Sequence, residues 1–173
     1  MRVLTGALVL AAGLVLASGV AAADAGYLQI KGSKQGEFKG DVQAKGKEGW
    51  NSVIGFNYTV PGASGRRVQT PVTFTLRWSK ATPMLINAAI TGEVLSEFRY
   101  SNWVPEATGM GTVVHADSLE FQGAKITSVQ VHDRTGDSDA VEPVVDITIS
   151  YQKAIVTHVQ GAITVLDDWT APK

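Results

Sequence analysis

The chain has 173 residues, of which 15 are Lys or Arg and 16 are Asp or Glu, so its formal net charge at pH 7 is -1. A nearly neutral chain is poorly suited to nucleic-acid binding, which relies on neutralising phosphates. The chain has no cysteine, which excludes disulfides, cysteine nucleophiles, thiolate zinc sites and iron–sulfur clusters.

The first residues of the chain have the pattern of an export signal. A short positive start, Met-Arg, precedes an uncharged run of small and apolar residues over 3–20. The following Ala-Ala-Ala-Asp-Ala matches the small-x-small pattern of signal peptidase sites. We predict a signal peptide over 1–23, with cleavage after Ala23 or Ala25, and a single domain over 26–173.

This leader predicts a secreted protein that is exported to the periplasm or the extracellular space. Two alternatives remain open at this stage. The leader is long enough, at the short limit, to be a retained transmembrane anchor. A misassigned start would make the leader an artefact and leave the protein in the cytoplasm.

The first half of the domain is predicted to consist of strands. Gly26–Lys31 and Phe38–Ala44 are short candidates at the front. Two longer segments, 50–60 and 67–78, alternate apolar and polar residues, which is typical of strands with one buried face. The turn residues at 61–65 lie between them and predict a hairpin. The expected inward residues are Ile54, Phe56, Tyr58 and Val60 in one strand, and Val68, Val72, Phe74, Leu76 and Trp78 in the other.

One segment lacks the period of two. We predict a short helix over about 82–91, with Thr82 as the N-cap, Pro83 in the first turn and Gly92 after the last turn. Leu85, Ala88 and Ala89 share one face of this helix.

Strands are predicted again in the second half of the chain. One covers 94–103, and the next two, 112–121 and 125–132, flank Gln122-Gly123-Ala124 as a second hairpin. A polar connection over 134–142 then leads into a long strand over 144–159. The whole pattern predicts a mainly β fold, an antiparallel β-barrel or sandwich with one short flanking α-helix at about 82–91.

The sequence contains no convincing catalytic or metal-binding pattern. The three histidines, His115, His132 and His158, are too far apart to form a short chelating pair. Asp167 and Asp168 are paired carboxylates, which can act in acid–base chemistry, but we interpret them as a solvated turn near the C-terminus. We therefore predict no catalytic residues, no metal site and no cofactor.

The other candidate residues are also interpreted without a catalytic or binding role. No nucleophile motif surrounds the serines, the acidic loop lacks the calcium-binding spacing, and the basic pair is too small for a nucleic-acid surface. The tryptophans are interpreted as core and rim packing. These candidates are Ser52, Ser64 and Ser79; Asp133, Asp137 and Asp139; Arg66 and Arg67; and Trp50, Trp78, Trp103 and Trp169.

Several stretches of the chain resemble the Hcp family, the tube proteins of type VI secretion. The most specific is Ser-Gly-Arg-Arg-Val-Gln-Thr-Pro-Val-Thr-Phe-Thr at 64–75, with Ser-Lys-Ala-Thr-Pro-Met-Leu at 79–85 and Gly-Glu-Val-Leu at 92–95. Weaker matches are Tyr-Leu-Gln-Ile-Lys-Gly at 27–32 with Gln-Gly at 35–36, and Tyr-Gln-Lys-Ala at 151–154 with Asp-Asp-Trp at 167–169. The resemblance spans about 26–172.

The resemblance implies a structural protein without enzymatic activity. Six copies would form a ring, rings would stack into a tube, and effectors would travel in the lumen. Its partners would be further copies of itself, the type VI spike and sheath proteins and effector cargo. Nucleic acid is not expected as a partner, nor is stable membrane insertion after removal of the leader.

Two surfaces are candidates for these roles. Polar, weakly charged side chains such as Gln69, Thr73, Thr75 and Ser101 are expected at the ring interface. The polar faces of 67–77 and 143–157 are candidates for the lumen. The alternative function is an exported Hcp-like barrel that binds a ligand without forming a tube, and an enzyme is least favoured.

Overall fold

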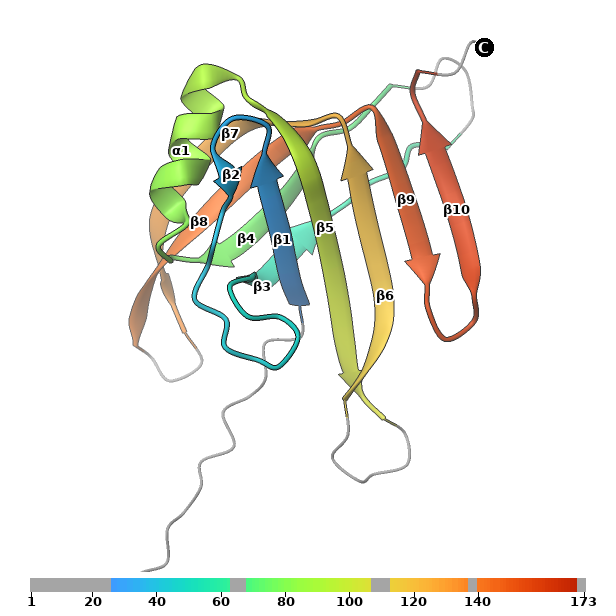
Figure 1. The fold of residues 1–173 in the computed structure, drawn as a ribbon, viewed down its shortest axis with the longest axis horizontal. Helices are drawn as coiled ribbons and strands as arrows, with labels where there is room; N and C mark the ends of the chain where they lie inside the picture. The colour runs from blue at the N-terminus through green and yellow to red at the C-terminus, as the bar shows by residue number, and fades with distance from the viewer. Residues whose placement is uncertain (1–25, 63–67, 107–112, 137–139, 171–173) are drawn as a thin grey trace, which may run out of the picture.

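The computed structural model describes residues 26–62, 68–106, 113–136 and 140–170 (Figure 1). The predicted leader lies outside these residues. The elements are β1 (Gly26–Gly32), β2 (Gly36–Glu37), β3 (Asn51–Asn57), β4 (Val72–Arg77), α1 (Thr82–Thr91), β5 (Val94–Pro105), β6 (Val113–Gln122), β7 (Ala124–Thr135), β8 (Val141–Ser150), β9 (Lys153–His158) and β10 (Ile163–Asp168).

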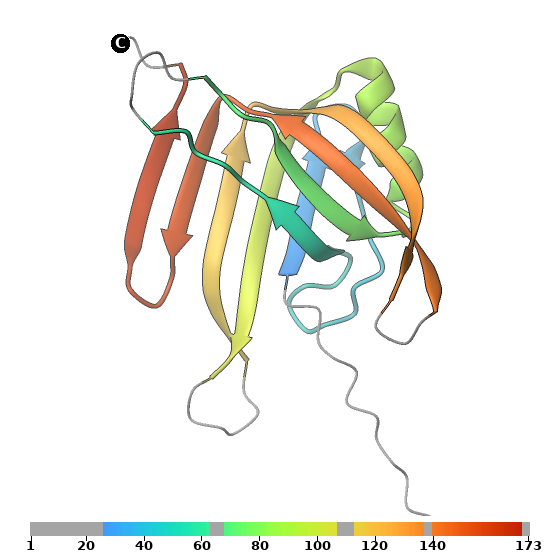
Figure 2. The ribbon, with the colours of Figure 1, turned by 180° about the vertical axis from the view of Figure 1, so that it is seen from behind.

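Six of the strands close into an antiparallel barrel. The strand order is β1, β3, β4, β8, β7 and β5, and β5 also pairs with β1, which closes the sheet (Figure 2). The remaining long strands, β6, β9 and β10, extend the sheet outward from β5. The predicted mainly β fold with one short flanking helix is therefore confirmed.

Alternating residues of the barrel strands fill its interior. The period of two in β4 and β8 places one side-chain set inward and the other outward. Burying each large apolar side chain contributes about 1.5–3 kcal/mol to folding. The largest fully buried side chains are Phe38, Phe74, Phe98, Phe121, Leu28, Ile30, Leu76, Leu85, Leu95, Ile147, Ile149 and Val72.

The helix has the predicted bounds. Pro83 lies in its first turn, and Gly92 ends it with a left-handed φ of 62°, a conformation that glycine adopts without a steric penalty. Leu85 and Ala88 are buried, and α1 packs against β7. The predicted N-cap is wrong by one residue: Ala81 occupies that position, and the Thr82 hydroxyl accepts a hydrogen bond from the Ser79 N–H at 3.2 Å. No helix of the described residues is long and apolar enough to cross a membrane.

The predicted strand at 38–44 is wrong, because this segment forms a loop. Phe38 N still donates to Ile30 O of β1 at 2.9 Å, but from Gly40 on the backbone bonds to the end of the same loop, with Gly40 N donating to Gly49 O at 2.7 Å. Buried Asn51 holds the loop to the barrel, since its side-chain Nδ2 donates to Phe38 O at 3.0 Å.

The hairpin predicted around 61–65 is confirmed, because β3 and β4 pair antiparallel. The inward residues are only partly right. Val53 is buried in place of Ile54, and the register shifts between Val53 and Gly55; Phe56 is 45% exposed, although its ring packs against Phe74 and Tyr100. Val68 and Trp78 lie beyond the ends of β4 and are exposed.

The second predicted hairpin is wrong, although its turn is present at Gly123, where φ is 63°. β6 and β7 do not pair with each other. Both pair with the edge of β5 that lies opposite β1, β6 along the later part of β5 and β7 only through its first two residues, and β7 then continues along β8.

The predicted long strand over 144–159 is two strands, β8 and β9. The chain leaves the barrel at Tyr151 and Gln152, where Gln152 N donates to Gln122 O at 2.9 Å, and β9 then pairs with β6. The buried set changes parity at this break, from Ile147 and Ile149 in β8 to Ala154 in β9. The predicted polar connection at 134–142 is also shorter, because β7 runs to Thr135 and β8 begins at Val141.

Candidate functional site

The outermost strand, β10, exposes apolar side chains on both of its faces. It pairs with β9 and ends the sheet in the strand order. Ile163, Val165 and Leu166 are 62%, 61% and 57% exposed. A sheet edge of this kind has unpaired backbone groups as well as apolar side chains, and it is a ready template for pairing with another chain.

A mainly apolar groove of about 530 Å³ runs beside this edge. One wall is the segment that follows β3, with Tyr58, Val60 and Pro61. The other wall comes from β9 and β10, with Val156, Val165, Leu166 and Asp167. The edge and the groove together form a continuous apolar surface on the extension of the barrel, and we call it the β10 surface.

Asp167 anchors the β10 surface to the core. It is 8% exposed, and its Oδ2 accepts hydrogen bonds from Trp169 Nε1 at 2.9 Å, the Tyr151 hydroxyl at 3.4 Å and the Tyr58 hydroxyl at 3.5 Å. Burial and these neighbours raise the pKa of the Tyr58 hydroxyl, so it remains a donor at neutral pH.

Asp168 is also held within the fold. Its carboxylate lies 2.8 Å from Lys153 Nζ, and hydrogen bonds from Lys153 and Thr170 lower its pKa. The interpretation of Asp167 and Asp168 as a solvated turn is therefore wrong, because both lie in β10 and fasten it to neighbouring elements.

The polar faces predicted for 67–77 and 143–157 meet where β4 and β8 pair. The hydroxyls of Thr73 and Thr148 lie 3.2 Å apart, and the Thr75 hydroxyl donates to Asp146. Glu142 binds Arg77 and Arg134, so the polar face continues onto β7. These side chains bond mainly to one another and form a polar surface, which we call the β4–β8 face.

Two of the expected interface residues are placed differently. Ser101 is 2% exposed, so it does not lie on an open polar face as expected. The Gln69 side chain donates to Tyr151 O at 2.6 Å and ties the segment before β4 to the end of β8.

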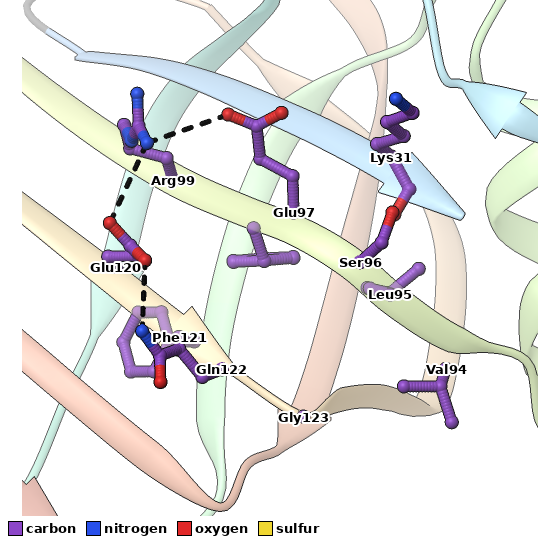
Figure 3. A pocket seen from close by; sticks show the side chains of 11 residues that line it. Lys31, Val94, Leu95, Ser96, Glu97, Arg99, Glu120, Phe121, Gln122 and Gly123 are labelled. Atoms are coloured by element: carbon purple, nitrogen blue, oxygen red, sulfur yellow. Dashed lines mark hydrogen bonds and ion pairs between the residues drawn. The ribbon is translucent and has the colours of Figure 1, made fainter. Parts of the chain in front are cut away.

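A shallow polar hollow of about 550 Å³ lies across β1, β5 and β6 (Figure 3). Arg99 is 3.7 Å from Glu97 and 3.6 Å from Glu120, and Gln122 donates to Glu120 at 3.2 Å. Arg99 is thus paired with Glu97 within β5 and with Glu120 across to β6, and Lys31 also lines the hollow.

Each of the three histidines contacts a different neighbour. His158 Nδ1 is 2.8 Å from Asp117, and this hydrogen bond lowers the pKa of Asp117. His132 is 3.8 Å from Asp146, and the His115 ring stacks on Trp103 at 5.0 Å. Among the described residues, no three acidic or histidine side chains lie close enough to hold a metal ion.

The remaining sequence candidates have local partners or lie outside the described residues. Ser79 is buried beside Asn51, Asp133 is exposed, and Trp50 and Trp103 flank Lys47. Trp78 is 47% exposed and Trp169 packs against the core. Ser64, Arg66, Arg67, Asp137 and Asp139 belong to the segments that are not described.

Sequence reasoning missed the β10 surface and the grouping of Lys47, Trp50 and Trp103. The alternating apolar residues of Ile-Thr-Val-Leu at 163–166 were a signal for a strand near the chain end. No local signal links Trp50 with Trp103, because pairing over that separation is set by the tertiary fold.

Comparison with known proteins gives a consistent answer. The family model described as "Type VI secretion system effector, Hcp" matches residues 27–158. The "Major exported protein" of Pseudomonas aeruginosa is 28% identical over 166 residues, covering 84% of this chain and 95% of the relative.

Solved structures share the fold over nearly their whole length. The secreted protein Hcp3 of Pseudomonas aeruginosa superimposes with a TM-score of 0.73 at 26% identity, covering 84% of this chain and 98% of the other. Hcp1 of E. coli EAEC 042 gives a TM-score of 0.70 at 22% identity, covering 85% and 99%. The family match covers most of the described barrel and agrees with its topology, so the chain belongs to the Hcp family, the tube proteins of the type VI secretion system.

Proposed function

We propose that this chain forms a closed hexameric ring, that rings stack into a tube, and that effectors travel in the lumen. The observation that carries the proposal is the β10 surface, which a single copy leaves exposed on both faces of an edge strand. Covering it with a neighbouring copy would remove its apolar side chains from water. An interface between two different surfaces repeats around a ring and closes by rotation.

The test is the mass of the particle in solution. Light scattering after size exclusion is expected to give about six times the mass of one chain, which is 18.3 kDa with the leader. Val165→Asp should shift the particle to the monomer, because it places a charge on the apolar surface. Circular dichroism should show that the variant keeps its strand signal.

Ile90→Asp is the matched control, because Ile90 is 78% exposed on α1, away from the β10 surface. It should leave the ring intact. A wild-type protein that remains monomeric at tens of micromolar would overturn the ring. That result would favour the alternative, an exported barrel that binds a ligand without a tube.

We further propose that the protein is not an enzyme and that the β4–β8 face lines the lumen. Its threonines and paired charges offer shallow polar contacts, and six-fold repetition would add avidity to individually weak contacts. Spike and sheath proteins would be further partners, and removal of a signal peptide over 1–23 would expose the domain that begins near Gly26. Loss of a measured hydrolase activity in Asp168→Asn would overturn the non-enzyme proposal.

A further inference from the structure

Lys47 lies between the rings of two tryptophans. Its Nζ is 4.4 Å from the ring centroid of Trp50 and 4.6 Å from that of Trp103. Both distances are within the roughly 6 Å at which a cation is attracted to an aromatic face. The three side chains come from the loop before β3 and from β5, so the fold, rather than local sequence, builds this group.

The ammonium of Lys47 has little other stabilisation. Within the part of the chain that the structure describes, no carboxylate lies at ion-pair distance from its Nζ. Burial lowers the pKa of Lys47, and the nearby charge of Arg99 lowers it further. The faces of the two indole rings are therefore the main groups of the described residues that attract this cation.

The two rings are held in place without Lys47. Trp103 stacks on His115 with an interplanar angle of 13°, and the two residues are partners in the β5–β6 ladder. Trp50 O accepts a hydrogen bond from Val42 N at 3.2 Å. A Cβ added to Gly40 would lie 2.4 Å from Trp50 O, so the loop backbone packs tightly here.

Two polar atoms of the same group have no partner among the described residues. These are Trp103 Nε1 and His115 Nε2, and both are buried. Buried polar groups are paired in the great majority of cases. Of these two atoms only His115 Nε2, when unprotonated, can accept a hydrogen bond from an ammonium group, since the indole Nε1 is a donor.

We propose that Trp50 and Trp103 form a binding site for an aliphatic cation, and that Lys47 occupies it until an incoming ammonium displaces it. A lysine side chain has a flexible four-carbon stem and can swing into water, where its charge is fully hydrated and farther from Arg99. The rings, held by β6 and the loop, remain as a preformed aromatic clamp. The incoming group is a lysine side chain of a protein or a small alkylammonium.

The experiment follows the two indole N–H signals by NMR, assigned with Trp50→Phe and Trp103→Phe. Choline is titrated into the wild-type protein and into Lys47→Gln, with sodium chloride as the ionic control. We expect Lys47→Gln to bind choline about tenfold more tightly, because the competing internal cation is gone. Trp103→Leu in the Lys47→Gln background should abolish the response.

A neutral isostere of choline, 3,3-dimethylbutanol, tests the need for charge. Equal binding of the two compounds, or no binding of choline to Lys47→Gln, would overturn the site. Nα-acetyl-lysine methylamide, compared with its norleucine counterpart, distinguishes the sources: its binding points to a protein lysine, and binding of choline alone points to a small quaternary ammonium. The particle mass is measured on the same samples. Loss of ring formation is then distinguished from loss of choline binding.

Discussion

At the scale of single residues, buried carboxylates hold this fold together rather than performing chemistry. Glu93 is 3% exposed and accepts hydrogen bonds from the backbone N–H groups of Lys34 and Gln35 and from the Gln35 side chain. It thereby ties the turn after β1 to the end of α1. Asp167 does the same for β10 with three aromatic donors. Both acids belong to short motifs that sequence reasoning attributed to the family, and neither motif predicted what the carboxylate would bind.

Glu93→Gln is expected to destabilise the domain by about 1–3 kcal/mol at pH 7, because it leaves buried donors poorly paired. Burial opposes ionisation of Glu93, but its hydrogen bonds outweigh burial and hold its pKa below the ordinary value of 4.5. The unfolded chain then binds the proton more readily than the folded one. The stabilisation is therefore present above that value and is lost as the pH falls through the folded pKa.

Urea unfolding at a series of pH values measures this effect. The difference between wild type and Glu93→Gln should narrow as the pH falls below 4.5. Glu37→Gln is the control, because Glu37 lies on the surface and makes only a 3.8 Å ion pair with Lys39. A difference between Glu93→Gln and wild type that is the same at every pH would contradict the role given to the Glu93 carboxylate.

At the scale of elements, local sequence signals predicted where helices and strands end better than they predicted which strands pair. Helix α1 was predicted with its observed ends because Pro83 and Gly92 mark them locally. The turn at Gly123 was likewise found, but β6 and β7 follow one another along the same edge of β5 instead of pairing, and partner choice depends on distant strands. The predicted inward parity of β3 is wrong before the register shift near Gly55, where Val53 is buried, since a bulge changes which side chains of a strand face inward.

The burial of α1 gives a direct test of its placement. Leu85→Asp should destabilise the domain by several kcal/mol, because it buries an unpaired charge at a position that is 1% exposed. Met84→Asp should cost less, because Met84 is only partly buried. Thermal unfolding of both variants measures the difference, and equal small effects would show that the buried face of the helix is misassigned.

At the scale of the whole molecule, the sequence predicted the class of fold and the family but not the assembly surfaces. The polar faces of 67–77 and 143–157 do lie together as far as β4 and β8 extend, since these two strands pair. The β10 surface was not predicted, because its exposure depends on β10 being the last strand in the sheet order of the described residues. A chain read residue by residue contains no information on which strand ends the sheet.

The lumen proposal predicts a separation of assembly from transport. Thr73→Ala combined with Thr148→Ala should leave the particle mass unchanged, because the pair lies on the β4–β8 face and not on the β10 surface. Recovery of a known effector in a pull-down should fall, since the change repeats in every copy of the ring. Thr157→Ala, whose hydroxyl lies 3.1 Å from Thr164 in the β9–β10 pair, is the control. Undiminished recovery from the double variant would remove this face from the lumen.

The position of β8 in the barrel has a consequence for how the chain folds. β8 lies between β7, its neighbour in sequence, and β4, whose residues are some seventy positions earlier. Until Ser150 has been synthesised, β4 and β7 both present unpaired edges, and the barrel stays open. Closure that waits on so distant a contact is slow, and open edges invite aggregation. Chains that stop before Val141 should therefore depend on chaperones more than the full chain does.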